Sequence, residues 1–175
     1  MKVCMFTTVP LNGPGGVENV AFNISKQLEA NGIETTSVHA YEKYSNPIIS
    51  VVKFRNVLKK VEKLNPDIIH THDTSGYWIA KSGLKYLHTS HGTWKHCFDY
   101  VQGSIKSNLV QKTSDLMLKA VIEGAKMNVA ISNFVNRYVQ DEYKIKRPMH
   151  IIHSGVETKK FKPGKKNRDS RTAVW

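Results

Sequence analysis

Apolar residues follow two different spacings along this chain, and the spacing changes repeatedly. Residues 2–8 are mostly apolar, which is typical of a strand buried on both faces by helices. From Val17 apolar residues recur every three or four positions, as on one face of a helix, until Asn31 and Gly32 signal its end. Further strands are predicted over residues 33–40, 67–72, 85–90, 127–131 and 149–153, and further helices over 49–64, 109–122 and the segment after Ser132. This alternation predicts an α/β fold with a doubly wound, Rossmann-like parallel sheet.

Each predicted helix presents an apolar face to the sheet. In the helix over 49–64 the opposite face is basic. Its apolar side carries Phe54, Val57, Leu58, Val61 and Leu64, and its basic side carries Lys53, Arg55, Lys59, Lys60 and Lys63. The core positions predicted for the two later helices are Leu109, Leu116, Val121, Ile122, Phe134, Val135, Tyr138 and Val139. Ser132 is expected to cap the last of these helices.

Length and composition fit one ordinary domain with a substantial core. The 175 residues are 40% hydrophobic and carry 26 Lys and Arg against 14 Asp and Glu, which gives a net charge of +12. No apolar run approaches the roughly 18 residues that span a bilayer, and the N-terminal segment lacks a signal-peptide cleavage site. Cys4 and Cys97 alone cannot build a disulfide framework or a C-x-x-C metal pair, which suits a reducing cytosol. We therefore expect a cytoplasmic protein.

The character of the sequence changes after residue 157. Residues 1–157 carry all the predicted strands and helices and are expected to form one domain. Residues 158–171 are rich in Lys and Arg and hold a single acidic residue, so they are predicted to be a basic linker. Residues 172–175 turn apolar and favour a strand. We expect them to begin a second domain that is truncated in this sequence.

The loop after the first strand is rich in glycine and opens directly into a helix. Gly15 and Gly16 stand at the helix start, where backbone N–H groups and the helix dipole favour an anion such as phosphate or carboxylate. A turn that merely needs glycine is the alternative. Glu18 occupies the position of the third glycine of a dinucleotide fingerprint, and a phosphate-loop lysine is absent. The sequence therefore predicts an anion site of another kind or a structural turn.

Histidines gather where the third and fourth strands end. His70 and His72 lie on one side of the third strand, Asp73 follows at once, and His91 follows the fourth strand. A metal site built from these residues is one interpretation. The others are a ligand-binding edge and histidines that only satisfy nearby backbone groups. The direct adjacency of Asp73 to His72 disfavours the metal site, so no metal is predicted.

These segments, taken in order, resemble the N-terminal half of the retaining family 4 glycosyltransferases, which have the two-domain GT-B architecture. The resemblance rests on Gly15-Gly16-Val17-Glu18, Pro66-Asp67-Ile68-Ile69-His70-Thr71-His72, His91-Gly92, Val129-Ala130-Ile131-Ser132, and Ser154-Gly155-Val156-Glu157 with Phe161 and Pro163. It covers nearly the whole chain, from Met1 to about Gly164. Ser154 and Glu157 depart from the Asn-Gly-Val-Asp run that is usual in the family.

The resemblance implies the acceptor-binding half of a hexosyltransferase that moves a sugar from a nucleotide-sugar donor to a glycan or lipid-linked acceptor with retention. It implies that Gly15 and Gly16 bring backbone amides to the donor diphosphate and that His91 is catalytic. Glu18, His72 and Ser132 would line the acceptor side of the cleft. The family's chemistry needs neither a metal nor another cofactor. The main donor contacts lie in the C-terminal domain, so that missing domain is an expected partner and the fragment alone is expected to be inactive.

Two other classes of function remain open on the sequence. The positive charge could serve a module that binds nucleic acid or anionic membrane. Nucleic acid is not expected because no aromatic residues are interleaved with the basic runs, whereas the basic face of the helix over 49–64 could lie against the inner face of a membrane. The other class is a different enzyme of GT-B shape, such as a sugar epimerase or a phosphorylase.

Overall fold

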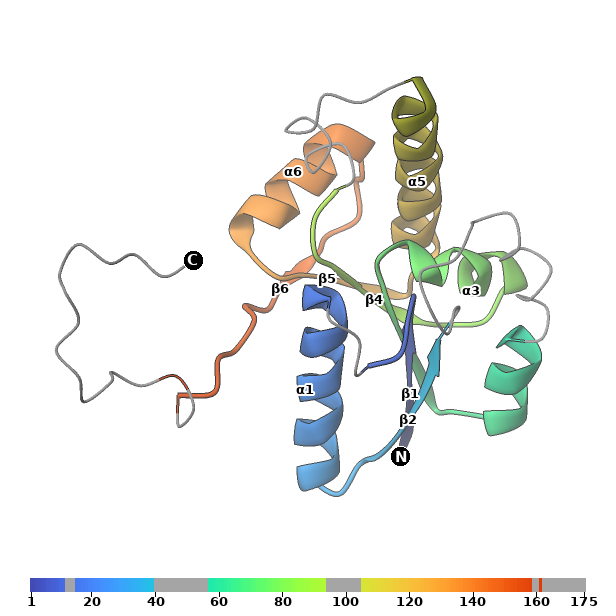
Figure 1. Ribbon diagram of the computed structural model, residues 1–175, viewed down its shortest axis with the longest axis vertical. Helices are drawn as coiled ribbons and strands as arrows, with labels where there is room; N and C mark the ends of the chain where they lie inside the picture. The colour runs from blue at the N-terminus through green and yellow to red at the C-terminus, as the bar shows by residue number, and fades with distance from the viewer. Residues whose placement is uncertain (12–14, 40–56, 94–104, 159–160, 162–175) are drawn as a thin grey trace, which may run out of the picture.

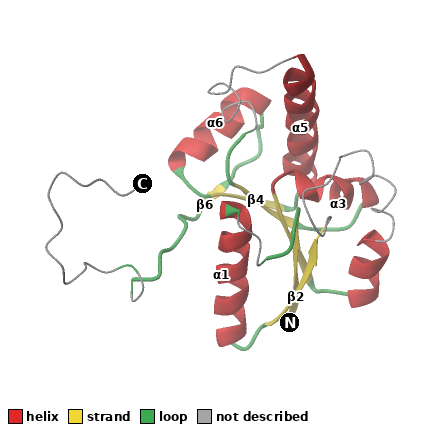
Figure 2. Cartoon of the chain, viewed as in Figure 1, coloured by secondary structure: helices red, strands yellow, loops and turns green. Residues whose placement is uncertain are grey.

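A computed structural model describes residues 1–11, 15–39, 57–93, 105–158 and 161. Helices and strands alternate along most of the described chain (Figure 2). The strands are β1 (Lys2–Thr7), β2 (Glu34–His39), β3 (Ile68–His72), β4 (Leu87–Ser90), β5 (Met127–Ala130) and β6 (His150–Ile151). The helices are α1 (Gly16–Ala30), a helix over residues 57–64, the short 3-10 helix η1 (Asp73–Gly76), α3 (Tyr77–Ser82), α5 (Ile105–Gly124) and α6 (Asn133–Tyr143).

The six strands form one sheet in the order β2-β1-β3-β4-β5-β6, and every neighbouring pair is parallel. The predicted doubly wound α/β fold is confirmed. All six strands are shorter than the sequence indicates, β4 by two residues and β6 by three. Tyr86 lies just before β4; its carbonyl accepts a hydrogen bond from the Lys126 N–H, and its hydroxyl donates to the Val121 carbonyl. At the sheet edge, β6 pairs only through His150 and Ile151.

Helices cover both faces of the sheet, with α1 on one side and α3 and α5 on the other (Figure 1). The larger buried cluster lies beneath α3, α5 and the helix over 57–64. It contains Cys4, Phe6, Val38, Val57, Val61, Ile69, Ile79, Tyr86, Val121 and Ala125. A second cluster joins α5, α6 and β5, and it contains Leu118, Ile122, Ala130, Val135, Val139, Tyr143, Ile145 and Met149. The two clusters therefore pack the helices against the central strands of the sheet.

Two predicted core positions are wrong. Leu116 is 70% exposed and Phe134 is 52% exposed. Leu118 and Ile122 set the buried stripe of α5, and Leu116 precedes Leu118 by two residues, which places it near the opposite side of the helix. Phe134 is one position before the buried Val135 and so faces away from its stripe. The predicted burial of Val121, Ile122, Val135 and Val139 is confirmed.

Several predictions fall partly or wholly outside the described residues. These are the first half of the helix over 49–64, with Lys53, Phe54 and Arg55, the burial of Leu109, and most of the linker and the second-domain start over 158–175. Lys59, Lys60 and Lys63 are described and exposed. In the described part of the chain, no helix is both long enough and apolar enough to cross a bilayer.

Candidate active site

The strand order creates a switch point between β1 and β3. The chain leaves β1 toward β2 on one side and later returns to β3 on the other, so the loops that follow these two strands diverge. Open parallel sheets bind ligands in the crevice that such diverging loops leave at the carboxyl ends of the strands. In this chain that position lies between the start of α1, which follows β1, and the end of β3 with η1.

The start of α1 leaves space for a ligand beside its backbone. Gly15 is the N-cap with an extended backbone, and no side chain of the described residues caps the helix. A Cβ atom added at Gly16 would meet nothing within 4 Å. The first N–H groups of a helix have no intrahelical acceptor and carry a partial positive charge. Gly15 and Gly16 therefore place the first backbone amides of α1 at this end of the sheet, with no side-chain cap from the described residues.

Glu18 lies in the first turn of α1 and is only 4% exposed. The sequence places Glu18 at a helix start, where an acidic side chain suits the dipole. Its burial comes from the tertiary structure. Asp73, which follows β3, is near enough for the Glu18 charge to raise its pKa.

His72 and His91 form a hydrogen-bonded pair across the ends of β3 and β4. His72 Nδ1 lies 3.0 Å from His91 Nε2, and the ring centroids are 5.4 Å apart at a 36° tilt. His72 is fully buried. His70 stacks on His72 with a centroid distance of 4.3 Å, and its Nε2 lies 2.8 Å from the Thr89 hydroxyl. The three histidines thus form a continuous row, stacked from His70 to His72 and hydrogen-bonded from His72 to His91.

Burial keeps these imidazoles neutral near pH 7. Removal from water lowers the pKa of His70 and of His91 to about 4. It lowers the pKa of His72 well below the usual value, and the nearby His70 adds to the effect. Burial also lowers the pKa of His88, which lies on the other face of the sheet, to about 3. A neutral imidazole has one N–H donor and one acceptor, so this cluster offers directed hydrogen bonds and no charge.

Asp73 has two features that sequence reasoning missed. Its backbone is left-handed, with φ of 50°, which turns the chain from β3 directly into η1. Desolvation, with the Glu18 charge, raises the pKa of its carboxyl to about 7, although the carboxyl accepts a hydrogen bond from the His91 backbone N–H. Aspartate tolerates the left-handed region better than most residues, which is the signal the sequence contains. Asp73 therefore ties the loop after β3 to the loop after β4.

Ser132 caps α6, as expected, because its hydroxyl accepts a hydrogen bond from the Val135 N–H at 3.1 Å. This bond explains the position of Ser132 without a ligand.

A pocket of about 160 Å³ lies between the loop after β4 and α6. The pocket is lined by His91, Gly92, Thr93, Phe134, Val135, Tyr138 and Val139. The exposed Phe134 ring therefore borders a hollow beside His91.

The structure brings together most of the residues singled out from the sequence. His72 and His91 are in contact, Asp73 contacts His91, and Glu18 lies within electrostatic reach of Asp73. No three His, Cys, Asp or Glu side chains of the described residues are placed so as to hold a metal ion. Chemically, the site combines open helix amides for an anion with neutral imidazoles that can bind hydroxyl or phosphate oxygens.

The parallel six-stranded sheet with its flanking helices has the Rossmann-like fold of a GT-B glycosyltransferase N-terminal domain. The family model of glycosyltransferase family 4 matches residues 14–160, and the chain belongs to this family. Among solved structures, it is similar to an alpha-glucosyltransferase in complex with UDP-glucose and DNA containing an abasic site, at 15% identity and a TM-score of 0.56. That match covers 88% of this chain and 42% of the other. No curated protein matches in sequence.

Proposed function

We propose that the protein to which this chain belongs transfers a sugar from a nucleotide-sugar donor to an acceptor with retention at the anomeric carbon. The chain would supply the acceptor-binding half, and a second domain would hold most of the donor. The family membership supports the reaction class. The observation that carries the proposal for this chain is the convergence of the open α1 amides and the His72–His91 pair on one sheet edge.

In this proposal each group at the edge has a role. Gly15 and Gly16 bind the donor diphosphate through backbone amides, and His91 contacts the transferred sugar. Glu18, His72 and Ser132 border the acceptor. The bond from the anomeric carbon to the diphosphate breaks while its bond to the acceptor oxygen forms, and the leaving diphosphate takes the acceptor proton. The scheme uses no metal and no cofactor.

The structural neighbour contains UDP-glucose, which supports a nucleotide sugar as the class of donor to test first. We place the protein in the cytoplasm, at the inner face of the membrane if its acceptor is lipid-linked. The exposed Lys59, Lys60 and Lys63 support this placement, since lysines near an anionic surface contribute about 1 kcal/mol each. Co-sedimentation with anionic and neutral vesicles tests it.

Gly16→Val tests the proposed function. Since a Cβ at Gly16 meets nothing within 4 Å, the variant should fold with a nearly unchanged thermal midpoint. The branched side chain would stand between the amides and the diphosphate. Each lost bond to a charged group contributes about 1.5–3 kcal/mol, so kcat/KM for the donor should fall more than about tenfold. The rate is measured on protein that includes the second domain.

The 175-residue chain alone should transfer nothing and bind donors weakly, because the principal donor contacts would be missing. A folded Gly16→Val variant with unchanged kcat/KM would show that the glycine pair is only a turn. Transfer by the 175-residue chain alone would refute the proposed division of labour.

A further inference from the structure

We propose that His72 is a positioning residue that fixes His91 in one tautomer, with its Nδ1–H directed to the cleft. The inference rests on the proposed role of His91 in sugar transfer. It identifies Nδ1 as the His91 atom that contacts the substrate, and His72 as the residue that keeps this nitrogen protonated.

The hydrogen bond between the two rings permits only two arrangements of a neutral pair. His72 Nδ1 and His91 Nε2 are 3.0 Å apart and share one proton. In the first arrangement His72 donates, and His91 carries its own proton on Nδ1. In the second, His91 donates from Nε2, and His72 carries its proton on Nε2. The state of the buried His72 Nε2 therefore reports which nitrogen of His91 is protonated.

Burial of His72 favours the first arrangement. Its Nε2 is inaccessible to water and has no hydrogen-bond partner in the described part of the chain. In the second arrangement this atom would be a buried N–H without an acceptor, whereas in the first it is an unused lone pair. Buried donors without acceptors are rarer in proteins than incompletely satisfied acceptors. His72 thus donates from Nδ1, and His91 retains Nδ1–H.

The neighbouring groups hold this arrangement in place. His70 stacks on the His72 ring and is itself bonded to Thr89, so the His72 ring has little room to turn. The Asp73 carboxyl accepts the backbone N–H of His91, which fixes the loop that carries it. The titratable groups that bear on the pair are thus His70 and Asp73 beside it, Glu18 on α1, and His88 on the opposite face of β4.

The assignment restricts the chemistry of the ligand atom that meets His91. Because Nε2 of His91 is occupied by His72, Nδ1 is the nitrogen left for the cleft. As an N–H, it binds an acceptor, such as a sugar hydroxyl oxygen or a phosphate oxygen, and it cannot remove a proton. His91 therefore orients the donor sugar or its diphosphate and does not act as a general base.

The direct test is nitrogen-15 NMR of the imidazoles at pH 7, which needs no turnover. We expect His91 of the 175-residue chain to show a protonated Nδ1 and an unprotonated Nε2. His72→Phe keeps an aromatic ring but removes the donor, so His91 should lose its single tautomer. His72→Asn keeps an N–H close to the position of Nδ1 and should restore the wild-type signature.

His88→Asn is the matched control. His88 is as buried as His72 but bonds to Thr71 on the other face and not to the pair, so this variant should leave the His91 tautomer unchanged. If His72→Phe does not fold, His72→Gln replaces it, because its amide reaches toward the Nε2 position and cannot donate to His91. In the protein with its second domain, we expect His72→Phe to lower kcat more than about tenfold, and His72→Asn to recover most of it.

A protonated His91 Nε2 in the wild type would overturn the inference, as would an unchanged His91 tautomer in both His72→Phe and His72→Gln. If neither variant folds, the wild-type spectrum still decides. Absence of sugar transfer by the protein with its second domain would instead refute the proposed function and leave the tautomer result standing.

Discussion

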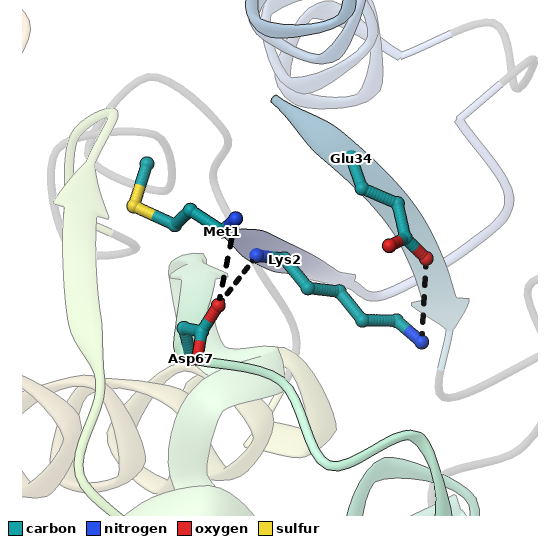
Figure 3. A network of polar contacts seen from close by, with 4 residues as sticks. All are labelled: Met1, Lys2, Glu34 and Asp67. Atoms are coloured by element: carbon teal, nitrogen blue, oxygen red, sulfur yellow. Dashed lines mark hydrogen bonds and ion pairs between the residues drawn. The ribbon is translucent and has the colours of Figure 1, made fainter. Parts of the chain in front are cut away.

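Ionisable side chains are exposed and paired at the amino edge of the sheet but buried at its carboxyl edge. At the amino edge, Asp67 accepts a hydrogen bond from the Lys2 backbone N–H at 2.7 Å and lies 4.0 Å from the N-terminal ammonium of Met1 (Figure 3). Lys2 Nζ lies 3.4 Å from a Glu34 carboxylate oxygen. At the carboxyl edge, His70, His72 and Glu18 are buried, and the described residues give them no ion pair.

The two edges differ in how far their ionisable groups are removed from water. At the amino edge, opposite charges meet in water, where ion pairs contribute at most about 1 kcal/mol. At the carboxyl edge, burial shifts the pKa of four histidines down and that of Asp73 up. Perturbed groups that gather at one edge of a sheet are typical of an active site. The perturbed groups of the described residues therefore gather at the carboxyl edge, where the candidate site lies.

Acid should produce the largest effect, because the carboxyl edge resists protonation. The buried histidines have a lower pKa in the folded chain than the usual 6.5, so the unfolded chain binds more protons as pH falls below 6.5. Asp73 has the opposite effect. Its pKa is raised to about 7 in the folded chain, so the folded chain binds this proton more readily and gains stability as the pH falls. Four histidines with lowered pKa values outweigh this single carboxyl. Urea unfolding should show a loss of at least about 2 kcal/mol between about pH 6.5 and pH 5.

Variants at the two edges sharpen this result. His88→Asn should reduce the slope of stability against pH by up to about 1.4 kcal/mol per unit, since one buried histidine is removed. Lys2→Met, at the amino edge, should leave the slope unchanged. Equal slopes for wild type and His88→Asn would break the comparison, because the buried histidines would then not dominate the acid response.

Gly76→Ala should have the next largest effect. A Cβ there would lie 2.8 Å from Thr71 Oγ1 and 2.9 Å from Val121 Cγ1, both within the core beneath η1. Overpacking of this kind costs about 1–3 kcal/mol. Gly16→Ala, at the same edge but in open space, should leave the free energy of unfolding within about 0.5 kcal/mol of wild type. Urea unfolding of both variants checks the contrast, and equal losses would contradict it.

Lys2→Met should have the smallest effect. The Lys2–Glu34 pair is 3.4 Å long and Glu34 is 63% exposed, so its removal should lower the free energy of unfolding by less than about 1 kcal/mol. The loss should shrink further in high salt, where surface charges are screened. A loss well above 1 kcal/mol that persists in high salt would mean that the amino edge, too, depends on its charges.

The sequence alone predicted the parallel sheet and most of its elements, because the spacing of apolar residues differs between strands and helices. It also predicted the polar residues at the carboxyl edge, because the ends of the strands can be located from the same pattern. The order β2-β1-β3-β4-β5-β6 and the contact between His72 and His91 depend on how separate strands pair. No local pattern carries that information.

Burial of polar groups was likewise decided only by the tertiary structure. The sequence pattern places Glu18 at a helix start and Asp73 after a strand, but only the tertiary structure brings the Glu18 charge near enough to Asp73 to raise its pKa. Leu116 and Phe134 show the converse, since both are apolar but face away from the buried stripes of their helices. A sequence records each residue's affinity for water, whereas access to water and to partners depends on segments that are distant in the chain.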